Sequence, residues 1–595
     1  MHAQRPKIWP ETCSGKVCPI ERMISPPEIK TILEHTVPDA PELKSAHTRS
    51  RLPEQTAIDL GLALAIFLLA VGYLWLFRRY TFMEPDEGII LQGAQRILRG
   101  EVLYRDFFSF FTPGSYYFVA LIFKTFGSSI IVARTVLVLI GATFSVITYL
   151  LARRVCSRES SLFVAGLVTA TTLPYRFLVL HNWDSTLWAC LTVYCAVRLV
   201  ESPGRPWAFA LGAFISLTFL FEQSKGAGLG LGLGLGLLAA HWGWQRILRT
   251  DALTALVLGL AWPFVITFAY FAAQHSLGIM LADWFWPLRH YSLANHVPYG
   301  YQTWSDETRH ALFGTNSIWM RSVTALTLSP CFLVPLLPLA AAGILAYWIV
   351  QMRRREASRS KCNYYVVTCA ALIGLLLSVV IGRADIIHFM YLLPLWGLML
   401  AWIVDGRDIP GRIFHNAKPI ITAFVAIAFL LFALALLTRA AGAHVESATR
   451  RGQITLPERD NVLGYMQAHV EPGETILVYP YLPLYYYLTA TFSPSRYEYF
   501  QPGMNTPEQA QGMLLQLAAT RVRVVLFEPG FPQKIPTSWP GTPLSAIAND
   551  PVTDYILREY RSCKILQSAN NWRFLFMVRK DAPCPETPPG ADENR

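Results

Sequence analysis

The stretch EPDEGIILQGAQRILRGEVLYRDFFSFFTPGSYYF (Glu84–Phe118) follows directly after the first long apolar segment of the chain. Three acidic residues, Glu84, Asp86 and Glu87, lie just beyond that segment, which is long enough to cross a bilayer. Asp106 follows on a loop that is rich in aromatic residues. Charged side chains at the edge of a membrane are costly, and they are usually kept for a function. These carboxylates are therefore the first candidate functional groups.

The same stretch predicts two helices at the membrane surface. Between Glu87 and Arg99, apolar residues alternate with glutamine and arginine at helical spacing, which is typical of an amphipathic helix lying in the interface. Pro113 begins a second, more apolar helix before the next membrane span. We expect a platform that places Asp86 at its entrance and Asp106 between its two helices.

The composition indicates a polytopic helical membrane protein. Of 595 residues, 53% are hydrophobic and 15% are charged, and the mean hydropathy is +0.34. A soluble protein carries about a quarter charged residues. The net charge of +11 does not indicate nucleic acid as a partner. The densest basic cluster, at 352–361, lies between two apolar runs, as cytoplasmic loops do.

The apolar runs predict a mainly α fold with about eleven membrane-spanning helices, each of roughly 20 apolar residues. The predicted spans lie near residues 56–77, 129–152, 160–178, 185–200, 206–222, 226–242, 252–274, 327–350, 364–382, 387–404 and 418–438. Within one span, glycines recur along Gly226–Gly236. This repeat predicts close packing against another helix and not a phosphate-binding loop, because no strand precedes it and no Lys-Ser/Thr pair follows it.

Basic residues predict which loops face the cytoplasm. With the N-terminus inside, each loop that returns to the cytoplasm carries Arg or Lys: 153–158, 197–205, 245–249, 352–361 and 405–412. Arg78 and Arg79, in the first outer loop, count against this orientation. The outer face then gathers the acidic stretch and the segments 178–186, 221–226, 275–326 and 382–388.

Three regions follow from this topology. Residues 1–55 are polar and proline-rich and predict a disordered cytoplasmic tail without a cleaved signal peptide. Residues 56–439 form the predicted membrane domain, with the two surface helices in the first outer loop at 80–127. Residues 440–595 predict a soluble α/β domain outside the membrane, which we expect to be a bacterial inner membrane.

The C-terminal region carries the pattern of a small α/β domain. Its predicted elements are the strands TILVYP (Thr475–Pro480) and RVVLFE (Arg523–Glu528), a helix at Thr506–Thr520, and a hairpin around Asn570 and Asn571. Cys563 and Cys584 would form a disulfide if the domain faces an oxidising compartment. No catalytic constellation is visible there, so we expect a role in packing, acceptor binding or partner docking.

The order of these features resembles a known family, the type C glycosyltransferases. The resemblance rests on the acidic pair Asp86 and Glu87, the amphipathic helix, a loop with Gly100, Tyr104 and Asp106, and the second helix begun by proline. The family includes protein O-mannosyltransferases, the aminoarabinose transferase of lipid A and lipopolysaccharide core transferases. The resemblance implies transfer of a sugar from a polyprenyl-phosphate carrier at the outer face of the membrane.

The resemblance also implies roles for two acids. In the family the Asp of the first-loop pair is the catalytic base, which maps onto Asp86, and a further acid after the third span maps onto Asp184. Two positions depart from the pattern. Ile89 and Ile90 stand where some relatives have a basic residue, and Thr112 stands where the aminoarabinose branch has Lys. These departures argue against that branch.

The chemistry of such a transfer requires residues of these types. A carboxylate must accept the proton of the attacking hydroxyl, and cations must stabilise the departing phosphate. We predict Asp86 as the base with Glu87 as its substitute. Asp106 and Asp184 are further candidate catalytic residues. The candidate ligands of the donor phosphate are Arg383, His388, Lys225 and Arg289. A platform for sugar or lipid would be formed by Trp284, Trp286 and Tyr291.

Each assignment has a structural alternative. The first-loop pair and Asp184 could also cap the helices that follow them, because acids favour helix N-termini. Asp106 could be a turn residue. Arg383 could serve only to pair with Asp385, and His388 could be an interface residue. The tryptophans and tyrosines at 283–304 could form an aromatic belt at the lipid headgroups.

These patterns together predict a membrane glycosyltransferase of the hexosyl- or pentosyltransferase type, similar to mannosyltransferases. The alternative is a transporter or lipid flippase, but transporters usually show inverted repeats and charges near the bilayer midplane, and no internal repeat is visible. The expected partners are a polyprenyl-phosphate sugar donor, membrane lipid, and a lipid, glycan or protein acceptor. The sugar stays open, as does participation of a divalent cation, Mg²⁺ or Mn²⁺, because a few carboxylates near a phosphate could hold such a cation or none.

Overall fold

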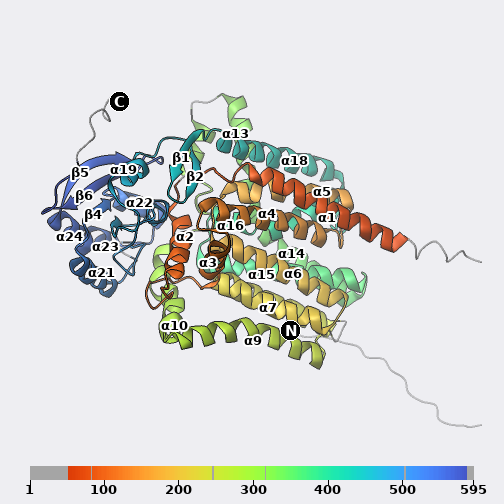
Figure 1. Ribbon diagram of the computed structural model, residues 1–595. Coiled ribbons are helices and arrows are strands. Elements are labelled where there is room, and N and C mark those ends of the chain that lie inside the picture. Colours follow the sequence, from red (N-terminus) through yellow and green to blue (C-terminus); the bar gives the residue numbers. More distant parts are fainter. Residues whose placement is uncertain (1–50, 82, 244–246, 315–316, 502–503, 586–595) are drawn as a thin grey trace, which may run out of the picture. The chain divides into compact units, whose positions relative to one another are not determined.

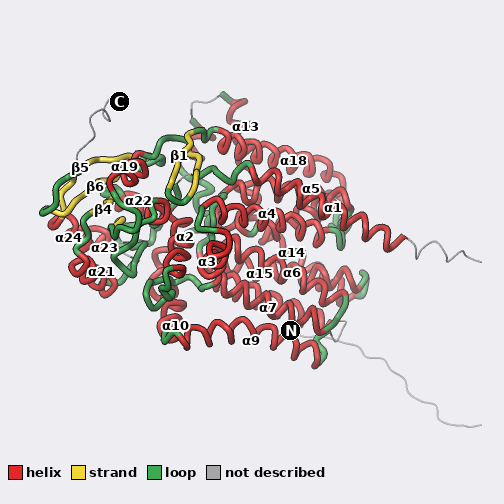
Figure 2. The backbone as a smooth tube through the Cα atoms, viewed as in Figure 1, coloured by secondary structure: helices red, strands yellow, loops and turns green. Residues whose placement is uncertain are grey.

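The computed structural model describes residues 51–81, 83–243, 247–314, 317–501 and 504–585. Long helices run as far as Ala441, and the strands of the described chain follow them (Figures 1 and 2). Residues 1–50 of the predicted tail lie outside the described residues. Each predicted span coincides with helical structure, in α1 (Arg51–Trp75), α4 (Ile130–Ala152), α5 (Arg158–Tyr175), α6 (His181–Glu201), α7 (Arg205–Phe221), α8 (Gln223–Gly243), α9 (Thr250–Ala273), α13 (Ile318–Leu333) with η2 (Val334–Leu336) and α14 (Leu337–Arg354), α15 (Arg359–Gly382), α16 (Ile386–Tyr391) with α17 (Leu393–Asp405), and α18 (Arg412–Ala441).

The length and composition of these helices confirm a helical membrane protein. Among the described residues, six helical runs are long and apolar enough to cross a membrane. They are Thr56–Trp75, Ile130–Ala152, Thr250–Ala273, Ile318–Arg354, Arg359–Gly382 and Arg412–Ala441. The helices α7 and α17 are apolar but shorter. Exposed leucines, isoleucines and valines along α9 and α18 form surfaces suited to lipid.

The glycine repeat packs α8 against α15, as predicted. A Cβ atom added at Gly228 would lie 2.3 Å from the carbonyl oxygen of Gly374, and one at Gly232 would lie 2.2 Å from that of Ala370. The spacing of four residues places both glycines on one face of α8. The absence of side chains there lets the two helix backbones approach closely, which is the common use of small residues between membrane helices.

The two helices predicted after the first span are α2 (Pro85–Leu98) and α3 (Gly114–Phe126). The interface location predicted for the first of them stays a prediction, and the structure shows that α2 is buried along almost its whole length. Gln92 and Arg96, on its polar face, do not face water. The side-chain amide of Gln92 donates to Glu498 at 3.2 Å, and the guanidinium of Arg96 donates to the carbonyl oxygen of Ser495 at 3.1 Å. The polar face of α2 therefore packs against the C-terminal region.

The loop between α9 and α13 contains short helices. These are α10 (Leu277–Trp286), η1 (Pro287–Tyr291), α11 (Ser292–Asn295) and α12 (Asp306–Phe313). The chain at Tyr301 forms an isolated bridge with Asp385, which lies just before α16. This bridge ties the long loop to the segment that carries two of the predicted phosphate ligands.

The C-terminal region contains a hairpin and a small α/β domain. The hairpin of β1 (Val445–Thr449) and β2 (Gly452–Leu456) precedes a sheet with the order β3-β4-β6-β5. Strand β3 pairs with β4 in parallel, and the other pairs of this sheet are antiparallel. The elements are β3 (Leu477–Tyr479), β4 (Val524–Phe527), β5 (Tyr560–Gln567), β6 (Arg573–Arg579), α19 (Asn461–His469), α20 (Leu484–Leu488), α21 (Pro507–Thr520), α22 (Phe531–Ser538), α23 (Leu544–Ala548) and α24 (Pro551–Glu559).

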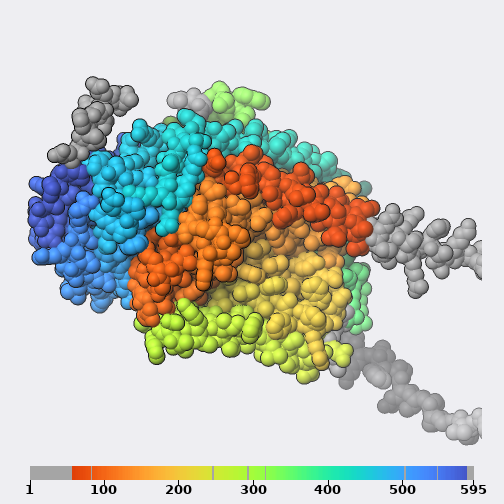
Figure 3. Space-filling model, in the orientation of Figure 1, coloured from red at the N-terminus to blue at the C-terminus, as the bar shows by residue number. Residues whose placement is uncertain are grey.

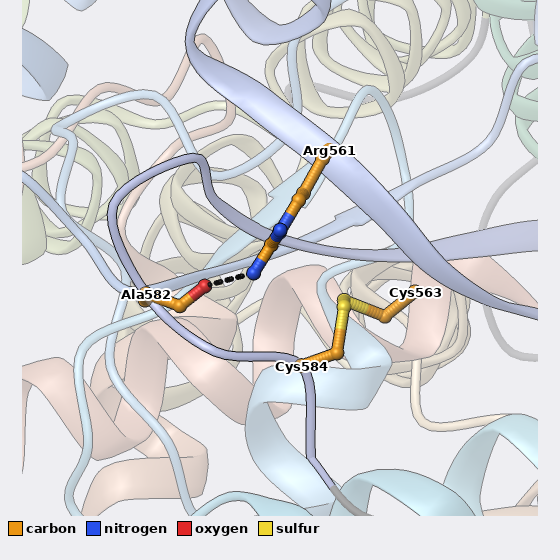
Figure 4. Close-up of a disulfide and its surroundings, with 4 residues drawn as sticks. All are labelled: Arg561, Cys563, Ala582 and Cys584. Atoms are coloured by element: carbon orange, nitrogen blue, oxygen red, sulfur yellow. Dashed lines mark hydrogen bonds between the residues drawn. A yellow bond between two sulfur atoms is a disulfide. The ribbon is translucent and has the colours of Figure 1, made fainter.

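The predicted strands, helix and hairpin of this domain are confirmed. Thr506 forms a capping box with Gln509 at the start of α21, which explains why the helix begins there. Cys563 and Cys584 form a disulfide with a Cα–Cα distance of 5.7 Å, and beside it Arg561 donates to the carbonyl oxygen of Ala582 (Figure 4). This bond fastens the chain after β6 to β5.

Helix α2 joins the C-terminal domain to the membrane helices. It packs against α3 and against α20. The space-filling view shows the surface of the C-terminal domain adjoining that of the segment that contains α2 and α3 (Figure 3). A Cβ atom added at Gly88 would lie 2.1 Å from the backbone nitrogen of Leu484, so only glycine permits this approach. The glycine of the PDEG sequence is thus a docking point for the C-terminal domain.

Candidate active site

The carboxylate of Asp86 lies in the first turn of α2 and is held by residues from two distant segments. Its Oδ2 accepts a hydrogen bond from Nη2 of Arg176 at 2.8 Å, and its Oδ1 accepts one from the hydroxyl of Tyr481 at 2.8 Å. The side chain stays 39% exposed. The N-cap residue of α2 is Glu84, whose side chain caps no backbone N–H. Asp86 is therefore an oriented carboxylate that solvent can reach.

Glu84 shares the same guanidinium. Its Oε2 accepts from Nη2 of Arg176 at 3.0 Å. Burial raises the pKa of the Glu84 carboxyl, and the positive charge of Arg176 partly offsets that rise. Two carboxylates therefore converge on one cation at the start of α2.

The neighbouring acid, Glu87, has a different environment. It is fully buried and accepts two hydrogen bonds from Arg134, from Nε at 2.9 Å and from Nη2 at 2.5 Å. It also accepts from the backbone N–H of Val179 at 3.1 Å. Arg134 in turn donates to the carbonyl oxygen of Tyr80 at 2.6 Å. An enclosed ion pair of this kind holds α2 onto α4, and its carboxylate is closed to a substrate, so the structure does not support Glu87 as the substitute base.

Asp106 organises its own loop. It accepts from the guanidinium of Arg105 at 2.9 Å and from the backbone N–H of Val102 at 2.7 Å. The hydrogen bond from Arg105 holds the pKa of the Asp106 carboxyl below its ordinary value. These contacts favour the alternative that Asp106 is a turn residue.

Asp184 is buried in the first turn of α6. Its Oδ2 accepts from the hydroxyl of Ser115, on α3, at 2.6 Å. The N-cap residue of α6 is Leu180, so Asp184 is not the cap. It joins two helices beneath the site and does not lie beside Asp86 in the hydrogen-bond network.

Two of the four predicted phosphate ligands are engaged by the protein itself. Arg383 uses all three side-chain nitrogens: Nε donates to Asp385 at 2.5 Å, Nη1 to Asn295 at 2.7 Å and Nη2 to the carbonyl oxygen of Ser538 at 2.6 Å. Lys225 is buried and donates to the carbonyl oxygen of Asn182 at 2.9 Å. It also forms an ion pair with Glu222 at 2.8 Å and donates to the hydroxyl of Ser185 at 2.7 Å. Phosphate binding by Arg383 or Lys225 stays a prediction.

The other two ligands are more accessible. His388 is 31% exposed, and its Nδ1 lies 2.7 Å from Oδ1 of Asp385. Burial raises the pKa of the Asp385 carboxyl, but His388 and Arg383 outweigh this effect and hold the pKa below its ordinary value. Arg289 is exposed on η1.

The predicted aromatic platform is largely packed. Trp284 donates its indole N–H to the hydroxyl of Tyr104 at 2.8 Å and is buried. Trp286 stacks on Phe110 with ring centroids 5.4 Å apart and lies edge-on to Phe108. The side chain of Tyr291 lies outside the described residues. The two tryptophans therefore anchor the long loop onto the segment between α2 and α3.

Arg176 is a candidate functional residue that the sequence analysis missed. It ends α5 and is 11% exposed. The hydroxyl of Tyr391 and the carboxylate of Asp385 also act on it electrostatically. Because Asp385 bonds to both Arg383 and His388, Arg176 links the first-loop acids to that cluster. The available signal was an arginine at the outer end of a predicted span, where charge is usually functional.

The described residues contain no group of three or more His, Cys, Asp or Glu side chains placed to hold a metal ion. The nearest cation to Asp86 and Glu84 is the guanidinium of Arg176. Participation of a divalent cation stays a prediction.

Comparison with known proteins gives one family model that matches part of the chain. Residues 112–271 match the family model described as dolichyl-phosphate-mannose-protein mannosyltransferase. The chain resembles the type C glycosyltransferases. The match includes Arg176, Asp184 and Lys225, and it begins after Asp86. No curated protein sequence matches the chain.

The comparison with solved structures gives matches at low sequence identity. ArnT from Cupriavidus metallidurans bound to undecaprenyl phosphate is 13% identical, with a TM-score of 0.49 over 90% of this chain and 100% of that chain. The same protein in the apo state is 13% identical, with a TM-score of 0.47 over 88% and 98%. The Archaeoglobus fulgidus oligosaccharyltransferase tethered with an acceptor peptide is 12% identical, with a TM-score of 0.46 over 86% and 74%.

The geometry around Asp86 permits proton acceptance. A carboxylate has about four lone-pair positions, and the hydrogen bonds from Arg176 and Tyr481 use two of them. The remaining positions can accept a proton from a hydroxyl at the exposed side. The guanidinium of Arg176 also places positive charge beside this carboxylate.

Proposed function

We propose that this protein transfers a sugar from a polyprenyl-phosphate carrier to an acceptor hydroxyl, with Asp86 as the general base. The observation that carries the proposal is the contrast between two adjacent acids. Asp86 is 39% exposed and oriented by Arg176 and Tyr481, whereas Glu87 is sealed in an ion pair. A general base has to be within reach of the proton that it accepts, and only the first of these acids meets that condition.

The reaction is a single displacement at the anomeric carbon of the sugar. Asp86 accepts the proton of the acceptor hydroxyl as its oxygen bonds to the anomeric carbon. The bond from that carbon to the phosphate oxygen breaks, and its electron pair leaves with the polyprenyl phosphate. Arg176 stabilises the charge that develops on the phosphate, and His388 is a further candidate donor. The family model that matches residues 112–271, described by a lipid-phosphate sugar donor, supports this donor class.

The site is proposed to face the outside of the cell. The helices that carry the site end, on the side away from it, in loops that contain Arg or Lys. These loops are 153–158, 352–361 and 405–412. The disulfide between Cys563 and Cys584 lies in the C-terminal domain, which contributes Tyr481. Disulfides persist in oxidising compartments, so the bond supports an extracytoplasmic domain and site.

The test uses a deletion strain and its complemented derivatives. Mass spectrometry of envelope glycans, glycolipids and glycoproteins identifies the sugar that is lost on deletion and restored by the wild-type gene. Asp86→Asn keeps the size of the side chain but removes its ability to take a proton, so we expect correctly folded protein that restores less than about a hundredth of the sugar. Restoration near the wild-type level by Asp86→Asn would overturn the proposed role of Asp86, and an unchanged sugar inventory on deletion would overturn the proposed activity.

A further inference from the structure

The C-terminal domain touches the proposed catalytic carboxylate directly. The hydroxyl of Tyr481 donates to Oδ1 of Asp86 at 2.8 Å, across 395 residues of sequence. The opposite oxygen, Oδ2, is held by Arg176. The terminal torsion angle of an aspartate side chain otherwise has a broad distribution. A donor on each oxygen restricts that rotation. The orientation of Asp86 therefore depends on a residue of the soluble domain.

Tyr481 is itself fixed by that domain. It follows β3 directly, where the carbonyl oxygens of Tyr479 and Pro480 accept from the backbone N–H groups of Glu528 at 2.9 Å and Phe500 at 3.0 Å. Its ring lies against Tyr499, Phe531 and Trp539, with centroids 6.2, 6.0 and 5.8 Å away. These contacts leave the ring little freedom and aim its hydroxyl at α2.

Two attachments on either side of Tyr481 hold the domain in register with the membrane helices. On one side, Gly88 lets the backbone of Leu484 approach α2, because a Cβ atom added at Gly88 would lie 2.1 Å from the backbone nitrogen of Leu484. On the other side, the end of α22 accepts two hydrogen bonds at its carbonyl oxygens. Arg383 donates to Ser538 at 2.6 Å, and Tyr301 donates to Thr537 at 2.8 Å.

We infer that Tyr481 is a positioning residue for Asp86, and that docking of the C-terminal domain through Gly88 completes the catalytic site. The inference rests on the proposed function of Asp86 and assigns to the soluble domain a part in the chemistry. The hydrogen bond from the phenol holds the carboxylate in one orientation. Tyr481 does not need to touch the substrate.

Other groups also face Asp86, and a test of its proton affinity has to keep them constant. From the start of α2 it faces Glu84, and Glu87 lies one residue further along. Further charged and titratable groups come from the elements packed against α2. Arg176 after α5 and Tyr481 after β3 contact Asp86 directly. His181 on α6, and Asp385 and Tyr391 at α16, act electrostatically on Asp86 or on Arg176. The variants below alter only Tyr481 or its approach to α2.

The experiment measures protonation of Asp86 without a substrate. Dicyclohexylcarbodiimide modifies carboxyl groups in their protonated form, and peptide mass spectrometry of the purified full-length protein resolves Asp86 from Glu84. The fraction of Asp86 modified is followed from pH 4 to pH 9 in the wild type and in Tyr481→Phe. One hydrogen bond to a charged group corresponds to roughly a tenfold change in an equilibrium constant. We therefore expect the midpoint of modification to move upward by about half to one pH unit, and sugar transfer in complemented cells to fall about tenfold.

Tyr487→Phe is the matched control. Tyr487 belongs to the same domain and its hydroxyl is buried without a hydrogen-bond partner among the described residues. Removing that hydroxyl should leave both the modification midpoint and sugar transfer at the wild-type values. An identical midpoint in the wild type and in Tyr481→Phe would overturn the inference while leaving the proposed base untouched, since that role is decided separately by Asp86→Asn.

A second pair of variants tests domain docking. Gly88→Ala places a Cβ atom against the backbone of Leu484, whereas Gly166→Ala, in α5, places one where no atom lies within 4 Å. Gly88→Ala should raise the modification midpoint as Tyr481→Phe does, although its tyrosine is intact, and Gly166→Ala should not. A folded Gly88→Ala protein, as judged by a monodisperse peak in size-exclusion chromatography, with the wild-type midpoint would show that docking does not position Asp86.

Discussion

The buried pair of Glu87 and Arg134 yields a quantitative prediction about stability. Both side chains are fully buried, and two N–H···O bonds at 2.9 and 2.5 Å join them. Glu87→Gln removes the negative charge and leaves the guanidinium unpaired in a medium of low dielectric constant. Breaking a buried pair in this way costs about 3–5 kcal/mol, whereas an exposed pair contributes about 0–1 kcal/mol. We therefore expect Glu87→Gln to lower the melting temperature by several degrees.

The assay is thermal unfolding of the purified full-length protein, followed by the loss of its monodisperse size-exclusion peak. Glu559→Gln is the control, because its partner Arg558 and its own side chain are 67% and 42% exposed. The double variant Glu87→Gln/Arg134→Met removes both charges and should recover most of the loss, since a neutral pair carries no unpaired charge. Equal melting temperatures for Glu87→Gln and Glu559→Gln would refute the assignment of a structural role. A stable Glu87→Gln protein that has lost sugar transfer would refute it as well, because that result would make Glu87 the catalytic base.

Three further predictions follow from the topology, the helix packing and one buried carboxyl. Impermeant thiol reagents on intact cells should label a cysteine introduced at Gln453 and spare one at Ser358, and the reverse pattern would place the site inside the cell. Gly228→Ala should destabilise the protein and Gly234→Ala should not. The Cβ atom added at Gly228 would lie 2.3 Å from a carbonyl oxygen, whereas one added at Gly234 has no atom within 4 Å. Equal thermal stability of the two variants would contradict the close packing of α8 against α15. Burial raises the pKa of the Asp283 carboxyl from 3.8 to about 7, so folding favours its protonated form and stability is lost as pH rises through that window. The gain in melting temperature from Asp283→Asn should therefore grow between pH 4 and pH 7 and stay constant above it, and a gain that does not depend on pH would contradict this account.

Several parts of the fold were predictable because they depend on local pattern. Each predicted span became helical, since runs of apolar residues have one favourable arrangement in a membrane. The glycine repeat at Gly226–Gly236 predicted close helix packing, and the strands and hairpin of the C-terminal domain followed from apolar runs bounded by turn residues. Cys563 and Cys584 are the two cysteines of that domain, so each had one possible partner within it.

The protein surroundings of α2 were not predicted. Its alternation of apolar and polar residues is typical of a helix at a membrane surface, but the polar side is covered by the C-terminal domain. A polar face signals only that its side chains find hydrogen-bond partners. Periodicity does not reveal whether those partners are water or a protein domain such as the one that supplies Glu498 and Ser495 to Gln92 and Arg96.

The sequence by itself determined a helical membrane protein with a C-terminal α/β domain, and it singled out the acidic pair Asp86 and Glu87. Only the tertiary structure separated the two acids, exposing one beside Arg176 and Tyr481 and sealing the other against Arg134. Adjacent residues on a helix point in directions about 100° apart, so their surroundings come from different neighbours. Those neighbours lie up to 395 residues away in the chain. A local sequence pattern does not specify which distant side chain packs against a given helix face.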